Sequence, residues 1–198
     1  MIYEGIDSIY RDTKDDCEKQ GKQDKILGCF QEQLGNVKSW NSEMIAGKTI
    51  LQSEVERFIQ NTHEFSIERL FDMAYIAILA DALKSLELDW SVEFNEMPTF
   101  SKYVHHIYRE TARALYRNPF LLVGKGTPKQ IQENRRAIIA IINDSVNDAL
   151  YKILPVNNMI NSFSLDTMKE RLYSDLVDYE SDQESDQESD QESDQESD

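Results

Sequence analysis

The stretch 66–88 carries apolar side chains at spacings of three and four residues without a break, and it constrains the fold more than any other stretch. This spacing places its apolar side chains on one face of an α-helix. Most of the opposite side is apolar too, so we expect a helix that is buried on nearly all sides and forms the centre of the fold. The first face consists of Ile67, Leu70, Phe71, Ala74, Tyr75, Ile78, Leu79, Ala82, Leu83 and Leu86, and the second of Met73, Ile76, Ala77 and Ala80.

The same stretch is too polar to cross a membrane, because charged residues interrupt it. Glycine and proline are few in the chain, and strand-like alternation of apolar and polar residues is scarce. These features favour an all-α fold. We therefore predict a single helical domain of about six helices over residues 1–179, arranged around a central buried helix, and an acidic tail over residues 180–198.

Local start signals place two of the other helices. Thr99 and the pair Thr127-Pro128 are typical of helix N-termini, since a threonine side chain accepts hydrogen bonds from the first free N–H groups and proline fits the first turn. Residues 35–52 lack a helical pattern and are interpreted as a loop. The expected helices, besides 66–88, are 1–19, 23–34, 53–60, 99–117, 127–154 and 164–179.

The last residues repeat a short polar unit. From Ser181 onward the unit Ser-Asp-Gln-Glu occurs four times without an apolar residue, so no core can form and the tail is predicted to be disordered. Each serine has an acid at +1 and a glutamate at +3, which resembles the acidophilic casein-kinase site. Phosphorylation would add about −1.5 to −2 charges at each serine, whereas the alternative is an inert, solubilising tail. The four candidate serines are Ser181, Ser185, Ser189 and Ser193.

Charge is distributed unevenly along the chain. The net charge is −16, yet segment 99–136 holds eight basic residues against two acids, and segment 180–198 holds ten acids and no base. The basic segment is interpreted as an interaction face for a protein partner, a neighbouring subunit or the chain's own tail. The alternative is a solvated surface paired with local acids. The predicted face consists of Lys102, Arg109, Arg113, Arg117, Lys125, Lys129, Arg135 and Arg136.

Nucleic acid is the less favoured partner for this face. Tyr103 and Tyr116 lie between the basic residues, as aromatic side chains do in proteins that stack bases. However, a net charge of −16 means that the whole molecule repels a polyanion at long range. By the same reasoning the acidic tail competes with any acidic partner of the arginines, so removing residues 180–198 is expected to tighten such binding at low salt.

No constellation of catalytic or metal-binding residues stands out in the sequence. The three histidines, His63, His105 and His106, belong to no zinc-binding motif, and the two cysteines, Cys17 and Cys29, lie far from them in sequence. We therefore expect no enzymatic activity, no metal and no cofactor. Two cysteines are too few for a disulfide framework, and the first residues lack the apolar core of a signal peptide, so a reducing, cytoplasmic location is predicted.

Three short segments resemble a known group of proteins. They are Tyr116-Arg117-Asn118-Pro119-Phe120-Leu121, then Asn134-Arg135-Arg136 at the start of an isoleucine-rich helix, and Leu154-Pro155-Val156. The pattern is similar to that of small helical proteins of nucleocytoplasmic large DNA viruses, of the iridovirus and marseillevirus kind, over roughly residues 66–165. The resemblance implies a protein of the infected-cell cytoplasm and of the virion, and it supplies no catalytic residue.

The function predicted from the sequence is therefore non-enzymatic. The chain is expected to be an interaction protein, of the viral structural or assembly type such as a minor capsid component, with a basic docking face and an acidic tail. Its partners would be proteins, including capsid proteins or further copies of itself. The alternative is an acidic protein associated with nucleic acid or with histones.

Overall fold

The computed structural model describes residues 1–42, 44–45, 47–62, 66–86 and 97–162, and nearly all of them are helical. Three short 3₁₀ helices connect the longer elements: η1 (Gln23–Lys25), η2 (Val37–Ser39) and η3 (Pro119–Leu122). The predicted all-α fold is confirmed. The α-helices of the described residues are α1 (Ile2–Lys19), α2 (Ile26–Asn36), α3 (Ile50–Asn61), α4 (Ile67–Ser85), α5 (Phe100–Arg117), α6 (Pro128–Lys152) and α7 (Val156–Ser162).

The chain divides into two compact units. The first comprises Met1–Ala82 and Asn95–Leu154, and it holds α1, α2, α3, α5, α6 and most of α4. The second comprises Leu83–Phe94 and Pro155–Asp198, and its described part holds the end of α4 and α7. The predicted helix over 164–179 and the predicted tail lie outside the described residues, whereas α7 was not predicted.

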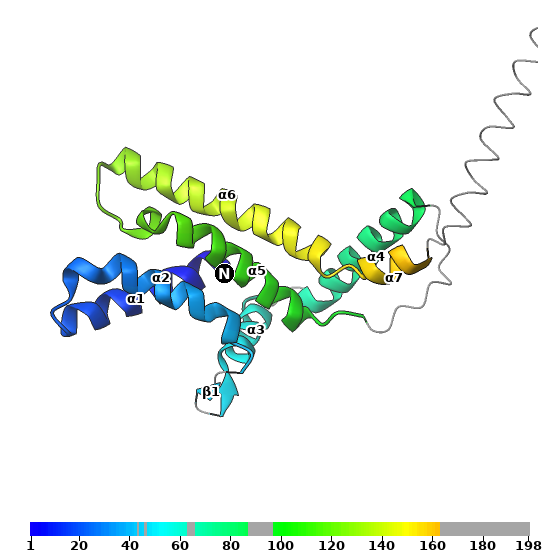
Figure 1. The fold of residues 1–198 in the computed structure, drawn as a ribbon, viewed down its shortest axis with the longest axis horizontal. Coiled ribbons are helices and arrows are strands. Elements are labelled where there is room, and N and C mark those ends of the chain that lie inside the picture. The colour runs from blue at the N-terminus through cyan, green and yellow to red at the C-terminus, as the bar shows by residue number, and fades with distance from the viewer. Residues whose placement is uncertain (43, 46, 63–65, 87–96, 163–198) are drawn as a thin grey trace, which may run out of the picture. The chain divides into compact units, whose positions relative to one another are not determined.

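The centre of the first unit is α5. The contact between α5 and α6 is more extensive than the contact between any other two described elements (Figure 1). Helix α5 also contacts α2, α3, η2 and η3. Its inner face is almost entirely closed to solvent, with Val104, Tyr108 and Leu115 at 0% exposure. The buried residues of α5 are Phe100, Tyr103, Val104, Ile107, Tyr108, Thr111, Ala112 and Leu115.

The prediction that residues 66–88 form the central helix is wrong. One stripe of α4 is buried, and its Phe71 stacks on Tyr103 of α5 with ring centroids 4.9 Å apart. Three other large apolar side chains of α4 face solvent: Leu70, Met73 and Ile76 are 47%, 68% and 48% exposed. The apolar periodicity of a sequence shows which side chains share a helix face. It does not show how many neighbouring helices cover that face, because this depends on the tertiary structure.

A tight reversal joins α1 to α2. Gly21 adopts a positive φ of 68°, a conformation that costs glycine little because it has no Cβ. The Lys22 N–H donates to the Cys17 carbonyl at 2.8 Å and the Gly21 N–H donates to the Glu18 carbonyl at 3.1 Å, which is the Schellman pattern that ends many helices. As a result α2 packs back along α1, and Figure 1 shows the two helices side by side.

Side-chain caps begin four of the described helices where the sequence carries the matching residues, and at the start of α4 Ser66 accepts from the Arg69 N–H at 3.3 Å. Thr99 accepts from the Lys102 N–H at 3.2 Å, and Thr127 accepts from the Gln130 N–H at 3.3 Å, so both predicted N-caps are confirmed. Thr49 caps α3 in the same way, through a reciprocal capping box with Gln52.

The interpretation of residues 35–52 as a loop is only partly right. The segment contains η2 and a two-stranded antiparallel ribbon in which β1 (Met44–Ile45) pairs with β2 (Lys48–Thr49). Gly47 occupies the turn of the ribbon with a φ of 84°. Helix α3 then begins at Ile50, earlier than predicted, because the Thr49 cap and Gln52 form a start signal within the segment.

A buried polar cluster ties α5 to α3 and α1. The Tyr108 hydroxyl donates to the Glu54 carboxylate, and Arg57 Nη2 donates to Glu54 Oε2 at 2.6 Å and to Tyr108 Oη at 3.0 Å. Arg57 Nη2 also reaches the Met1 carbonyl at 3.1 Å. Burial, followed by the charge of Glu54, raises the pKa of Tyr108 well above its ordinary value, so the phenol stays a neutral donor. Gly5 of α1 lies directly against the cluster.

Candidate functional site

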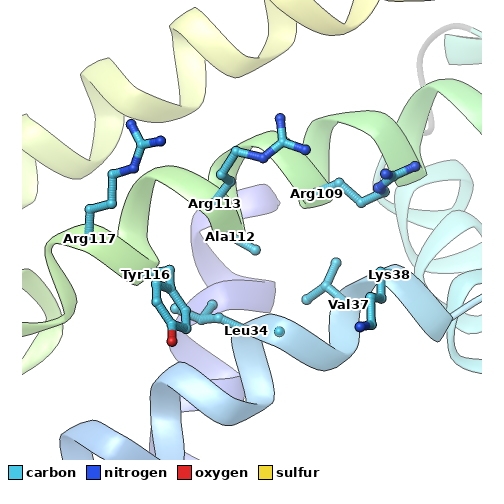
Figure 2. Close-up of a pocket in the computed structure, with 9 residues that line it drawn as sticks. Leu34, Val37, Lys38, Arg109, Ala112, Arg113, Tyr116 and Arg117 are labelled. Atoms are coloured by element: carbon cyan, nitrogen blue, oxygen red, sulfur yellow. The ribbon is translucent and has the colours of Figure 1, made fainter.

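A groove of about 510 Å³ runs between α2 and α5, and it is the strongest candidate for a functional site (Figure 2). Its floor is apolar and its rim is basic. No carboxylate, imidazole or thiol is among the described residues that line it. We call it the α2–α5 groove; its lining residues are Leu34, Gly35, Val37, Lys38, Arg109, Ala112, Arg113, Tyr116 and Arg117.

The floor of the groove is made where α2 meets α5. Leu34, Val37 and Ala112 are 3%, 1% and 3% exposed, because they form part of the contact between the two helices. Two polar contacts hold the walls at fixed positions. Gln31 Nε2 donates to the Tyr116 carbonyl at 2.8 Å, and His105 Nε2 lies 2.9 Å from the Val37 carbonyl. The groove is therefore built from packed helices rather than from loops.

The basic rim comes from both walls. Arg109, Arg113 and Arg117 recur every four residues on α5, so the repeat along the helix axis is roughly 6 Å. Lys38 lies in η2, which directly follows α2, and it adds a fourth cation from the opposite wall (Figure 2). Tyr116 is 50% exposed, and Figure 2 shows its ring between the two helices. The rim thus joins three cations from α5 to one from η2.

Only one of the four rim cations is neutralised by an ion pair in the described part of the chain. Arg113 Nη1 lies 2.7 Å from Glu110 Oε2, and Glu110 also pairs with Lys152 of α6 at 2.8 Å. Within the same described residues, Lys38, Arg109 and Arg117 have no carboxylate partner. The rim therefore presents uncompensated positive charge on a molecule whose net charge is −16.

Two neighbouring titratable groups respond to this charge. Burial raises the pKa of Glu110, but the hydrogen bond from Lys152 and the charge of Arg113 outweigh it, so the net pKa lies below its ordinary value. The pKa of His106 is lowered, first by burial and then by the charges of Arg109 and Lys102. Near neutral pH, Glu110 is therefore anionic and His106 is neutral.

The structure divides the eight residues of the predicted basic face. All are exposed, but only the three arginines of α5 line the α2–α5 groove. Lys125 lines a separate cavity beside α1 and α2, and Lys129 pairs with Glu133 at 3.8 Å. Arg135 lies over the Tyr3 ring of α1, 5.4 Å from its centroid. Outside the groove are thus Lys102, Lys125, Lys129, Arg135 and Arg136.

Sequence reasoning missed the α2 side of the groove. Leu34 and Val37 are apolar at a spacing of three and Lys38 follows directly, which is a local sign of a buried edge next to an exposed cation. Nothing in the sequence alone places this edge opposite α5. The predicted phosphorylation sites Ser181, Ser185, Ser189 and Ser193 lie outside the described residues.

Neither a metal site nor a membrane span occurs among the described residues. In these parts of the chain no three side chains of His, Cys, Asp or Glu come together as a metal would require. Within the same ranges, no helix has both the length and the apolar character that crossing a bilayer demands.

Comparison with known proteins places the chain in one family. The model of DUF5764, a family of unknown function, matches residues 1–123, which include α1 to η3 and both walls of the α2–α5 groove. Neither the curated proteins nor the solved structures contain a match to the chain. Because the match covers more than half of the chain, the protein is a member of DUF5764.

Proposed function

We propose that this protein is a non-enzymatic interaction protein that holds an acidic, extended segment of a partner protein in the α2–α5 groove. The observation that carries the proposal is the basic rim above an apolar floor, with Arg109, Arg117 and Lys38 free of ion pairs in the described residues. Charges left without a local partner are available to an external anion. The described residues that line the groove include no histidine, carboxylate or thiol, which favours binding over catalysis.

The spacing of the arginines favours an extended partner segment. Cations four residues apart on a helix repeat at roughly 6 Å, and alternate side chains of an extended chain repeat at roughly 6.6 Å on the same face. Acids at every second position of an extended segment therefore meet Arg109, Arg113 and Arg117 in turn. An apolar side chain of the segment would contact the floor at Leu34 and Val37. A structural or assembly role, as in a virion, is one setting for such a contact.

The test is a binding titration with a defined probe. A synthetic peptide of the repeating unit Ser-Asp-Gln-Glu has acids at every second position, and a matched peptide with Asn and Gln in place of Asp and Glu has none. Binding is measured by fluorescence anisotropy at two salt concentrations, with the full chain and with a chain that lacks residues 180–198. We expect the acidic peptide to bind, more weakly at high salt, and more tightly without the acidic tail, which would otherwise compete.

Three substitutions locate the binding site. Arg109→Ala and Arg117→Ala should each raise Kd by up to about fivefold at low salt, since an exposed ion pair is worth at most about 1 kcal/mol. Arg136→Ala is the matched control, because Arg136 is an exposed arginine of the same basic segment outside the groove. If all three variants weaken binding equally, the groove is not the site. If a single-stranded oligonucleotide binds through Arg109 and the peptide does not, the nucleic-acid alternative replaces the proposal.

A further inference from the structure

The two cysteines of the chain, separate in the sequence, lie together between α1 and α2. Cys17 and Cys29 line one cavity of about 480 Å³. Thr13, four residues before Cys17, and Gln33, four residues after Cys29, line the same cavity, as expected for two antiparallel helices in register. The Cys29 side chain, ahead of burial, is the largest cause that raises the pKa of the Cys17 thiol, so the two thiols influence each other. The sequence analysis did not predict that the two cysteines lie close together.

The local structure fixes both thiols. Cys17 accepts the first bond of the Schellman motif through its carbonyl, so its backbone is held where α1 ends. The contact of Tyr10 with Phe30, at a centroid distance of 5.3 Å, further sets how α2 lies on α1. Packed helices have axes about 8–10 Å apart and a Cα radius of about 2.3 Å, so directly facing Cα atoms are separated by about 3.4–5.4 Å, which overlaps the range a disulfide needs. A disulfide requires a Cα separation of roughly 4.4–6.8 Å.

We propose that Cys17 and Cys29 form a reversible intramolecular disulfide that fastens α2 to α1. Formation requires an oxidant, which we take to be a small-molecule or protein disulfide. Cys29 is the partly exposed thiol, whereas Cys17 is 5% exposed, so Cys29 reacts first. This proposal is independent of the function proposed for the α2–α5 groove.

The exchange proceeds in two balanced steps. The Cys29 thiol loses its proton to solvent. The resulting thiolate attacks one sulfur of the oxidant disulfide, forms a mixed disulfide and expels one thiolate. The Cys17 thiol then loses its proton to solvent, and its thiolate attacks the Cys29 sulfur of the mixed disulfide, forms the Cys17–Cys29 bond and expels the second thiolate. The two expelled thiolates take up the two protons. Two protein thiols are oxidised and one external disulfide is reduced to two thiols.

The bond would act on the hairpin and on the neighbouring groove. It closes the short loop that contains Gly21 and η1, which restricts the unfolded chain and so stabilises the fold. Helix α2, which it fastens, also supplies Leu34 to the floor of the α2–α5 groove and leads directly into Val37 and Lys38. Oxidation is therefore expected to raise the melting temperature, by up to about 10 °C for a domain of this size.

The experiment uses the full chain, equilibrated with glutathione buffers of increasing oxidised fraction and then quenched with acid. Intact mass spectrometry under non-reducing conditions should show a monomer that has lost two hydrogen atoms, and a thiol-alkylating reagent should no longer label either cysteine. The melting temperature should rise on oxidation and return to its starting value after reduction. Because the chain has only these two cysteines, an intramolecular disulfide can join no other pair.

Controls separate the proposal from its alternatives. Cys29→Ser retains only Cys17, and its melting temperature should not respond to the redox buffer. The proposal is overturned if native protein retains two free thiols in fully oxidised glutathione while urea-unfolded protein forms the disulfide. It is equally overturned if the products are glutathione adducts at both cysteines, or dimers linked between chains on a non-reducing gel.

Discussion

Substituting Gly5 by alanine should destabilise the protein strongly, because the Tyr108 side chain of α5 packs directly against this residue of α1. A Cβ on Gly5 would lie 2.9 Å from Arg57 Nη2 and 3.0 Å from Tyr108 Cζ, and closer still to Tyr108 Oη. Tyr108 is fully buried and its hydroxyl is held by Glu54 and Arg57, so the ring has little room to withdraw. The methyl group therefore either separates α1 from α5 or breaks the hydrogen bonds of the cluster.

The magnitude follows from the two costs. Inserting a methyl group into a packed interior costs about 1–3 kcal/mol. Disturbing the hydrogen bonds between Tyr108 and the charged groups of Glu54 and Arg57 adds about 1.5–3 kcal/mol. We expect Gly5→Ala to lower the free energy of unfolding by about 3–5 kcal/mol, a large part of the stability of an ordinary domain. The measurement is a urea titration followed by circular dichroism.

The chain contains a matched control for this substitution. Gly28 lies in α2, is exposed, and a Cβ there would meet no heavy atom within 4 Å. Gly28→Ala should therefore stabilise the protein by about 0.5–1 kcal/mol, since alanine loses less conformational entropy in a helix. In a Tyr108→Phe background the cost of Gly5→Ala should fall, because the nearest atom is gone. A loss below about 0.5 kcal/mol for Gly5→Ala would refute the close packing described here.

Two further predictions concern the centre of the fold and its response to pH. Leu115→Ala, on the fully buried face of α5, should lower the free energy of unfolding by about 2–5 kcal/mol in a urea titration. Met73→Ala, on the exposed side of α4, should change it by less than about 0.5 kcal/mol. Equal costs for the two substitutions would contradict the central place of α5. Because the folded pKa of Glu110 lies below its ordinary value of 4.5, its contribution to stability is present above that pH and is lost as the pH falls through the folded pKa. Glu110→Gln should therefore flatten the loss of stability between pH 7 and pH 3 in titrations at stepped pH; an unchanged pH profile would show that this carboxylate is not linked to folding.

Features that depend on neighbours in sequence were predictable, and features that depend on distant neighbours were not. The Thr99 and Thr127 caps follow from side chains that bond to N–H groups three residues away, so local sequence was sufficient. The recurrence of Arg109 and Arg113 on one side of α5 also follows from helical geometry. Lys38 reaches the same groove from a segment far away in sequence, and Glu54 reaches Tyr108 in the same way. Which of the basic residues bind a partner remains a prediction.

The three arginines of the groove rim on α5 have different consequences for how sequences of this family change over evolutionary time. Arg109 and Arg117 have no ion pair within the described residues, so their replacement alters the surface potential and leaves the interior untouched. Arg113 differs, because it shares Glu110 with Lys152 of α6 and a change there disturbs the pairing of the two helices. If the α2–α5 groove binds a partner as proposed, its preference can therefore change through the two outer arginines without a compensating change in the core. The middle arginine is expected to change only together with Glu110 and Lys152.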